Sequence, residues 1–206
     1  MIPASITQWA DLLRSCGVEP DTASTWAPFF FAEIKAGTFS AGDDDLCNFL
    51  GQVLHESGYL EVLEENLNYS PERLRAVWPL RFPSPVAAMP FAHHAEALAN
   101  KVYGGRLGNT EPGDGWAFRG SGPIQVTGRA NFTELQALTG IPLIEHPELL
   151  RRPGAEAVRL CVAWWEKHIP DGILGSAARV TKMVNGGYVG FEERQAITKK
   201  ARAALA

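Results

Sequence analysis

Apolar positions recur at helical spacing along most of the chain. The clearest case is the segment 41–56, whose apolar positions follow the i, i+3, i+4, i+7, i+8 spacing of a helix with one buried face. These positions are Leu46, Phe49, Leu50, Val53 and Leu54. Alternating apolar and polar runs, which mark half-buried strands, are nearly absent. The pattern predicts a mainly α fold.

Capping residues locate the ends of other predicted helices. Ser5 with Gln8 three residues later forms a capping-box arrangement, and Gly17 closes the helix that follows. Ser70 followed by Pro71 starts a short helix. Further helices are predicted over residues 22–35, 93–102, 128–138, 154–167, 175–184 and 190–204.

Two segments interrupt the helical pattern. Four prolines between residues 79 and 92 predict a loop. Seven glycines between Gly104 and Gly122 predict a long loop or a short hairpin. Long loops of this kind tend to carry function rather than packing.

Composition narrows the function classes. A chain of 206 residues with 46% hydrophobic and 20% charged residues is typical of one globular domain with a real core. Its net charge of −4, spread along the chain, leaves no electrostatic footprint for nucleic acid. The longest apolar run, WAPFFFAEI, is too short and too interrupted to span a bilayer, so we expect no stable membrane insertion.

The cysteines and the N-terminus indicate a compartment. Cys16, Cys47 and Cys161 are far apart and show no CxxC spacing, which predicts free thiols in a reducing compartment. The N-terminus lacks a basic start followed by an apolar core, so we expect no secretory signal. The protein is therefore expected to be made and folded in a cytoplasm.

The stretch HESGYLEVLEEN, residues 55–66, is rich in acid. Its glutamates are Glu56, Glu61, Glu64 and Glu65. Glu56 follows Phe49 by seven residues and Val53 by three, so on a helix it lies near the buried face at the C-terminal end. Apolar packing and the negative end of the helix dipole both favour the protonated carboxyl, the form that a general acid needs. A charged helix end with solvated glutamates remains the alternative reading of this stretch.

Glu65 lies nine residues after Glu56, beyond Gly58, which ends the helix. The two carboxyls can then face each other across a cleft. HES has no second histidine four residues on, so the zinc-protease pattern is missing. No other cluster has metal-ligand spacing, and we expect neither a metal nor a cofactor.

The glycine-rich segment carries groups that suit a sugar. It is not a phosphate loop, because no GK[ST] follows, and GSGPIQ lacks the third glycine of a dinucleotide fingerprint. Amide, hydroxyl and aromatic groups together can bond sugar hydroxyls and stack on sugar faces. The residues that provide them are Trp116, Phe118, Gln125, Thr127, Arg129 and Asn131.

Several motifs occur in an order that resembles a known family. HES, ENLNYS, VYGGRLGN, PGDGWAFRGSGPIQVTGR and VNGG resemble the glycoside hydrolase family 19 chitinases, and most of all their compact phage and bacterial endolysin relatives. The resemblance covers about residues 40 to 204. It implies a lysozyme-like fold with two helical lobes and a cleft. We expect one catalytic domain, 1–206, in which residues 1–40 form a helical extension packed on a family core of 41–204.

The resemblance also implies roles for individual residues. Glu56 matches the general acid, Glu65 the general base, and Thr127 a hydroxyl residue that helps hold the attacking water. The substrate-binding candidates are Tyr103, Trp116, Arg119, Gln125, Asn131 and Asn185.

Two points stay open at the level of the sequence. Glu64 is an alternative base, because only the match to the family register separates it from Glu65. The family usually reads FRGRG where this chain reads FRGSG, so Ser121 replaces a cation. One ion pair or substrate contact is therefore in doubt.

The expected function is that of an endolysin, an inverting N-acetylmuramidase that cleaves β-1,4 bonds in peptidoglycan glycan strands. A monomer would leave the cytoplasm of a host bacterium through a holin pore and act in the periplasm and cell wall. A chitinase acting on β-1,4-N-acetylglucosamine polymers is the alternative with the same linkage. A secreted antibacterial effector is also possible. A non-catalytic glycan-binding protein is disfavoured, because both Glu56 and Glu65 are present.

Overall fold

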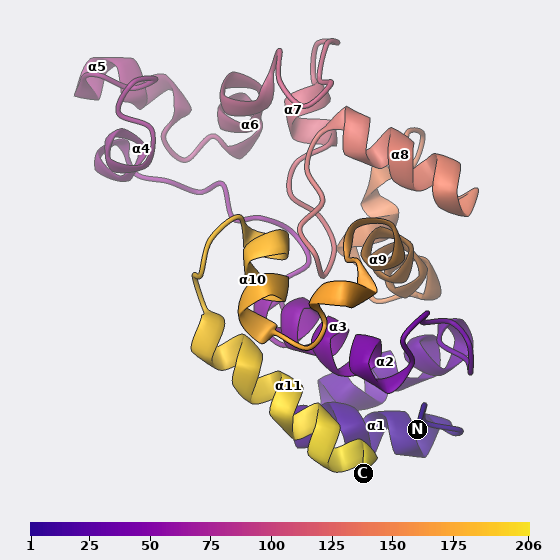
Figure 1. The fold of residues 1–206 in the computed structure, drawn as a ribbon. Coiled ribbons are helices and arrows are strands. Elements are labelled where there is room, and N and C mark those ends of the chain that lie inside the picture. The colour runs from indigo at the N-terminus through magenta and orange to yellow at the C-terminus, as the bar shows by residue number, and fades with distance from the viewer.

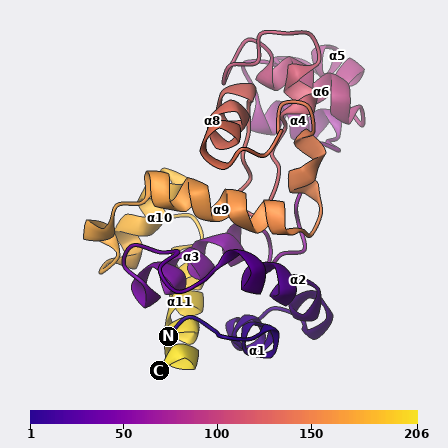
Figure 2. The same ribbon diagram turned by 90° about the vertical axis from the view of Figure 1, so that its right-hand side faces the viewer.

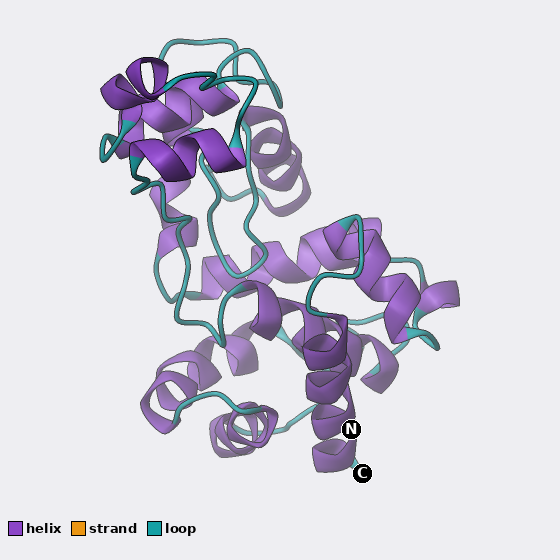
Figure 3. Ribbon diagram, turned by 90° about the vertical axis from the view of Figure 1, so that its left-hand side faces the viewer, coloured by secondary structure: helices purple, strands orange, loops and turns teal.

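The computed structural model describes the whole chain, residues 1–206, as helices and loops without a β-strand (Figure 3). The predicted mainly α fold is therefore confirmed. The α-helices are α1 (Ile6–Cys16), α2 (Pro20–Glu33), α3 (Asp43–Glu56), α4 (Pro71–Val77), α5 (Pro85–Ala88), α6 (Ala95–Tyr103), α7 (Asp114–Ala117), α8 (Arg129–Thr139), α9 (Ala155–His168), α10 (Ala177–Asn185) and α11 (Phe191–Leu205). The 3-10 helices are η1 (Met89–Phe91), η2 (Pro147–Arg151) and η3 (Asp171–Ile173).

The helices form two lobes (Figures 1 and 2). The large lobe contains α1, α2, α3, α9, α10 and α11, and the small lobe contains α4 to α8. Both termini lie at the end of the large lobe that is remote from the small lobe. After α3, Leu60 and Leu63 still pack in the core of the large lobe, and the chain then passes to the small lobe.

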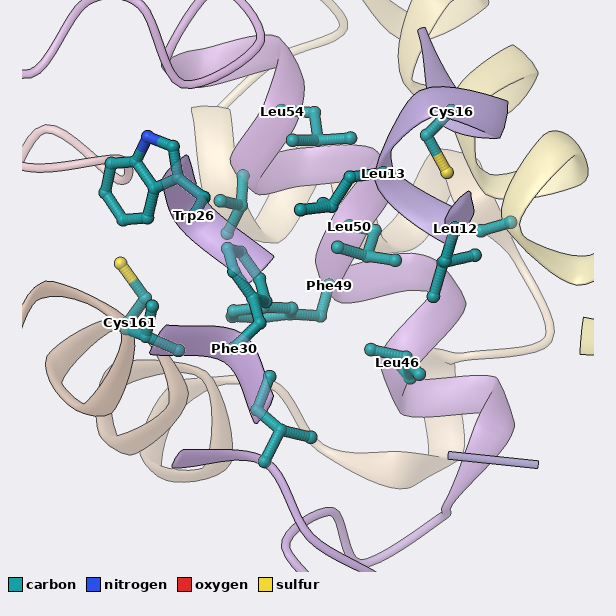
Figure 4. Packing of buried hydrophobic residues seen from close by; sticks show 14 of the residues in the cluster. Leu12, Leu13, Cys16, Trp26, Phe30, Leu46, Phe49, Leu50, Leu54 and Cys161 are labelled. Carbon is teal, nitrogen blue, oxygen red and sulfur yellow. The ribbon is translucent and has the colours of Figure 1, made fainter. Parts of the chain in front are cut away.

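Helix α3 runs through the centre of the large lobe. All five apolar positions that the spacing predicted on its inner face, from Leu46 to Leu54, are at most 1% exposed. Figure 4 shows four of them packed against side chains of α1, α2 and α9. Burying one such side chain contributes about 1.5 to 3 kcal/mol. Packing of α3 in the core therefore fixes the position of its last residue, Glu56.

The first 40 residues share this core. Trp9 and Leu13 of α1 and Trp26 and Phe30 of α2 belong to the same hydrophobic cluster as α3. The predicted ends of α1 are confirmed by its caps. The Gln8 N–H donates to the Ser5 hydroxyl, and Gly17 has a left-handed φ of 107°. The division of the chain at residue 40 into an extension and a family core stays a prediction.

The proline-rich segment of the small lobe differs from the prediction. A loop was expected over residues 79–92, but α5 and η1 form there. Pro85 and Pro90 stand in the first turns of these helices, where a missing N–H costs nothing, and the Ser84 hydroxyl accepts the Ala87 N–H at 3.2 Å. Two of the four prolines thus lie at the start of helices instead of preventing them.

The glycine-rich segment contains the one-turn helix α7 and a short hairpin. Ser121 and Val126 exchange backbone hydrogen bonds of 3.0 and 2.9 Å. The hairpin also pairs with the chain that follows α3, because the Gly122 N–H donates to the Leu63 carbonyl at 2.8 Å and the Glu65 N–H to the Gly120 carbonyl at 3.0 Å. This pairing brings the end of the acidic stretch beside the hairpin.

The cysteines are buried and unpaired, which confirms the prediction of free thiols. Burial raises the pKa of Cys16 to about 12 and the pKa of Cys47 to about 11, so both remain protonated thiols of low reactivity. None of the helices has both the length and the apolar composition that crossing a bilayer requires.

Candidate functional site

Glu56 ends α3 and is paired with a buried arginine. Its Oε1 accepts a hydrogen bond from Nη2 of Arg194 at 2.5 Å, and the side chains of Glu56 and Arg194 are 22% and 1% exposed. Arg194 also donates to Gln52 Oε1 at 2.7 Å and to the Val189 carbonyl at 3.2 Å. The sequence interpretation considered only burial and the helix end. The structure adds a buried positive charge in direct contact with the Glu56 carboxyl group.

A second group of side chains fixes the end of α3 against the start of α11. Glu193 accepts a hydrogen bond from the Tyr59 hydroxyl at 2.6 Å and lies 2.7 Å from Nδ1 of His55. The bond from Tyr59, followed in effect by the contact with His55, lowers the pKa of Glu193. Gly190, the residue before α11, packs against His55. A Cβ on Gly190 would come within 2.1 Å of the His55 ring. Glu56 therefore takes its position from two helices at once.

Glu65 is held by donors from two other elements. Its Oε1 accepts the Gly120 N–H at 2.5 Å, and its Oε2 accepts the Tyr103 hydroxyl at 2.7 Å. Burial, and then the bond to Glu65, raise the pKa of Tyr103, so its hydroxyl remains a donor. A Cβ on Gly120 would lie 3.1 Å from the Glu65 Cβ, so a larger residue here would press on Glu65. Two uncharged donors therefore fix both oxygens of the Glu65 carboxyl group.

The neighbouring Glu64 is engaged differently. Its Oε1 accepts a hydrogen bond from Nε of Arg119 at 2.6 Å. The Arg119 side chain is 8% exposed, and its guanidinium lies over the Trp116 ring, with Cζ 3.5 Å from the ring centroid. Arg119 also donates to the Trp116 carbonyl at 2.7 Å. Glu64 is thus engaged in an ion pair, whereas Glu65 has only uncharged donors, and this difference favours Glu65 as the base. The roles of Trp116 and Arg119 toward substrate stay predictions.

A chain of hydrogen bonds joins the hairpin to α8. Gln125 has a left-handed φ of 53°, and its Oε1 lies 3.0 Å from where a Cβ on Gly120 would be. The Thr127 hydroxyl donates to the Gln125 carbonyl at 3.0 Å, and Asn131 Nδ2 donates to the Thr127 carbonyl at 2.7 Å. Gln125, Thr127 and Asn131 are thus linked to one another beside Glu65.

Two other residues from the sequence analysis lie apart from this group. Arg129 makes a bidentate pair with Asp114 at 2.8 and 2.6 Å, so its guanidinium is engaged within the loop. Asn185 is exposed at the end of α10, where Gly186 closes the helix with a left-handed φ of 75°. Asn185 belongs to the large lobe, and its contact with a sugar stays a prediction.

The comparison with known proteins decides the family. A protein of Haemophilus influenzae described as a glycosyl hydrolase family 19 domain-containing protein is 37% identical over 148 residues, which are 71% of this chain and 72% of that protein. The chain belongs to glycosyl hydrolase family 19. No family model matches it, so the membership rests on this relative.

Two further proteins resemble this family 19 member. An endochitinase of Arabidopsis thaliana is 27% identical over 70 residues, 34% of this chain and 25% of the endochitinase. A crystal structure of a chitinase C mutant aligns over 98% of this chain and 92% of its own, with a TM-score of 0.54 and 16% sequence identity. At this identity the structural match shows the fold alone, and it confirms the predicted lysozyme-like helical architecture.

A member of family 19 is a glycosidase, so the predicted class of enzyme is confirmed. Sequence reasoning named Glu56 and Glu65 as candidates but missed the contacts of Arg194, Glu193 and Tyr59 at the end of α3. Nothing in the local sequence distinguishes a buried arginine from an exposed one. No three His, Cys, Asp or Glu side chains are arranged to hold a metal ion.

Proposed function

We propose that this family 19 glycosidase inverts the configuration of the sugar it cleaves, with Glu56 as general acid and Glu65 as general base. The observation that supports this most is the environment of Glu65. Two uncharged donors, the Gly120 N–H and the Tyr103 hydroxyl, hold its carboxylate in one direction without neutralising it. A carboxylate held in this way can take a proton from a water molecule.

The acid has to carry a proton when substrate binds. The 22% of the Glu56 side chain that is exposed is hydrated in the free protein. A bound glycan displaces that water from the carboxyl group. The proton then passes to the glycosidic oxygen as the bond to the leaving sugar breaks. Glu65 takes a proton from the water that attacks the anomeric carbon on the opposite face.

Thr127 is proposed to place this water. Its hydroxyl hydrogen is used in the bond to the Gln125 carbonyl, so the lone pairs of Oγ1 are left to accept a bond from water. Gln125, Asn131 and Asn185 supply amides for sugar hydroxyls. Tyr103, Trp116 and Arg119 complete the proposed substrate contacts.

The proposed substrate is the glycan strand of peptidoglycan, cleaved between N-acetylmuramic acid and N-acetylglucosamine. The support is the resemblance of the motifs to compact endolysins of the family. The proposal includes a monomeric enzyme that leaves the cytoplasm of a host bacterium through a holin pore and acts in the periplasm and cell wall.

Chitin is the second candidate substrate. It is favoured by the descriptions of two similar proteins, an endochitinase and chitinase C. The two polymers share the β-1,4 linkage between amino sugars, so one pair of carboxyls can serve both reactions.

The test is to digest purified sacculi and chitin oligomers side by side and to analyse borohydride-reduced fragments by mass spectrometry, with Glu65→Gln as the inactive control. Reduced muramic acid ends are expected. Reduced glucosamine ends would replace the muramidase by a glucosaminidase, and faster cleavage of chitin would make chitin the substrate. NMR of the anomeric proton in the first minutes should show the α product; an initial β product would overturn inversion. Fragments with cut peptides alone would remove the muramidase proposal.

A further inference from the structure

Ser121 occupies the position where the family pattern carries an arginine. Its side chain is fully buried, and its backbone bridges to Glu64 on one side and Val126 on the other. The next residue toward the N-terminus is Gly120, whose N–H holds Glu65. The arginine of the family pattern is therefore missing at the point where the hairpin packs against the acidic stretch.

An arginine from another part of the chain reaches this point. Nε of Arg151, the last residue of η2, donates to the Ser121 hydroxyl at 2.9 Å, and its Nη2 donates to the Ala117 carbonyl. Packing fixes the backbone next to Arg151. The preceding residue, Leu150, is 1% exposed in the cluster that α8, η2 and α9 share. A Cβ on Gly122 would lie 3.2 Å from Leu150, so η2 and the hairpin are in close contact.

Positively and negatively charged side chains lie around the Arg151 guanidinium. Burial, and then repulsion from Arg119, lower the pKa of Arg151 to about 10, while Glu64, Glu148 and Glu65 act in the opposite direction. A pKa of about 10 keeps the guanidinium charged at neutral pH. Two arginines, Arg119 and Arg151, therefore flank the pair of adjacent glutamates.

We propose that Arg151 is a positioning residue that replaces the cation missing at position 121 and holds the hairpin where the Gly120 N–H reaches Glu65. The connection is continuous. Arg151 donates to the Ser121 hydroxyl, and that hydroxyl donates to the Arg119 carbonyl at 2.8 Å. The peptide that carries this carbonyl also carries the N–H of Gly120. The effect on catalysis rests on the proposed role of Glu65 as the base.

The kinetic test removes the guanidinium at position 151 and then restores one at position 121. Arg151→Ser is compared with Arg152→Ser, a matched control in which the neighbouring, exposed arginine is changed. We expect Arg151→Ser to lower kcat by roughly 10- to 100-fold, with KM changed less than about twofold, because a base displaced by about 1 Å loses alignment rather than affinity. The control should keep the wild-type kcat. The double variant Ser121→Arg/Arg151→Ser should recover most of the loss, and Arg151→Lys, which keeps the charge, should recover part of it.

A wild-type kcat in Arg151→Ser would overturn the proposal. So would a double variant that folds but is no faster than Arg151→Ser. If the double variant does not fold, Arg151→Lys decides in its place: a kcat equal to that of Arg151→Ser would count against the proposal.

A second measurement does not depend on activity. The amide proton of Gly120 donates to a carboxylate, so its NMR chemical shift reports the contact with Glu65. We expect the resonance to move upfield in Arg151→Ser, to return in the double variant and to stay in place in Arg152→Ser. An unchanged Gly120 resonance in folded Arg151→Ser would refute the positioning role. If no glycan is hydrolysed but the resonance moves as expected, the proposed function fails and the role of Arg151 in the hairpin stands.

Discussion

Glu56→Gln tests whether the carboxyl group of this side chain is the proton donor, because the substitution removes the proton and keeps the shape. The substitution keeps nearly the same volume and retains an oxygen that can accept a bond from Arg194. It removes the proton donor and the negative charge. General acid catalysis contributes typically 10²- to 10⁴-fold, so kcat is expected to fall by about that factor.

The structure also predicts a cost in stability. Breaking a buried ion pair by removing one partner costs roughly 3 to 5 kcal/mol. Arg194 is 1% exposed, but Glu56 is 22% exposed, and Arg194 keeps its bond to Gln52 at 2.7 Å. We therefore expect a smaller loss of about 2 kcal/mol in the free energy of unfolding, between the values for an exposed and a buried pair. For a chain of this size, that is a fall in Tm of roughly 4 to 8 °C.

A double-mutant cycle measures this coupling. Urea unfolding is followed for the wild type, Glu56→Gln, Arg194→Met and the double variant, and kcat is measured on the same samples. The Arg194→Met change removes the donor to Gln52 Oε1 in both backgrounds, so that loss cancels in the cycle. A coupling energy below about 0.5 kcal/mol would show that Arg194 does not respond to the charge of Glu56. A wild-type kcat in Glu56→Gln would mean that the acid lies elsewhere.

Glu65→Gln is expected to abolish hydrolysis, whereas Glu64→Gln should mainly lower Tm; a silent Glu65→Gln beside an inactive Glu64→Gln would exchange their roles. Gly120→Ala should lower kcat about tenfold with a small change in Tm, because its Cβ would come within 3.1 Å of Glu65 and displace the carboxylate. The bond from Arg129 lowers the pKa of Asp114, so this carboxylate contributes stability above its ordinary pKa of 3.8 and loses it as pH falls through the still lower folded-state value. Asp114→Asn should therefore cost about 1.5 to 3 kcal/mol in urea unfolding at pH 7, and the difference from wild type should shrink below pH 3.8; a constant difference would contradict the pairing. Hydrolysis should survive EDTA, because two carboxylates need no metal; loss that one divalent ion rescues would reveal a metal site.

Local sequence was sufficient for most helices, whereas the roles of Glu56 and Glu65 came from the family resemblance and stay predictions. The apolar spacing in residues 41–56 identified the inner face of α3, since a helix repeats its face every 3.6 residues whatever surrounds it. Ser5, Gly17 and Ser70 marked helix ends, because capping depends on groups within a few residues. The prolines of 79–92 misled for the same local reason, because a proline can end a helix or occupy its first turn.

Only the tertiary structure decided what holds the two carboxyls. Arg194 is 138 residues from Glu56, and Tyr103 is 38 residues from Glu65. The replacement of the missing cation at Ser121 comes from Arg151, 30 residues away. An arginine or tyrosine looks the same in a sequence whether it is exposed or buried. Its partner is selected when segments far apart in the sequence fold together, and a carboxylate's charge responds to the groups within a few ångströms of it in space and not along the chain.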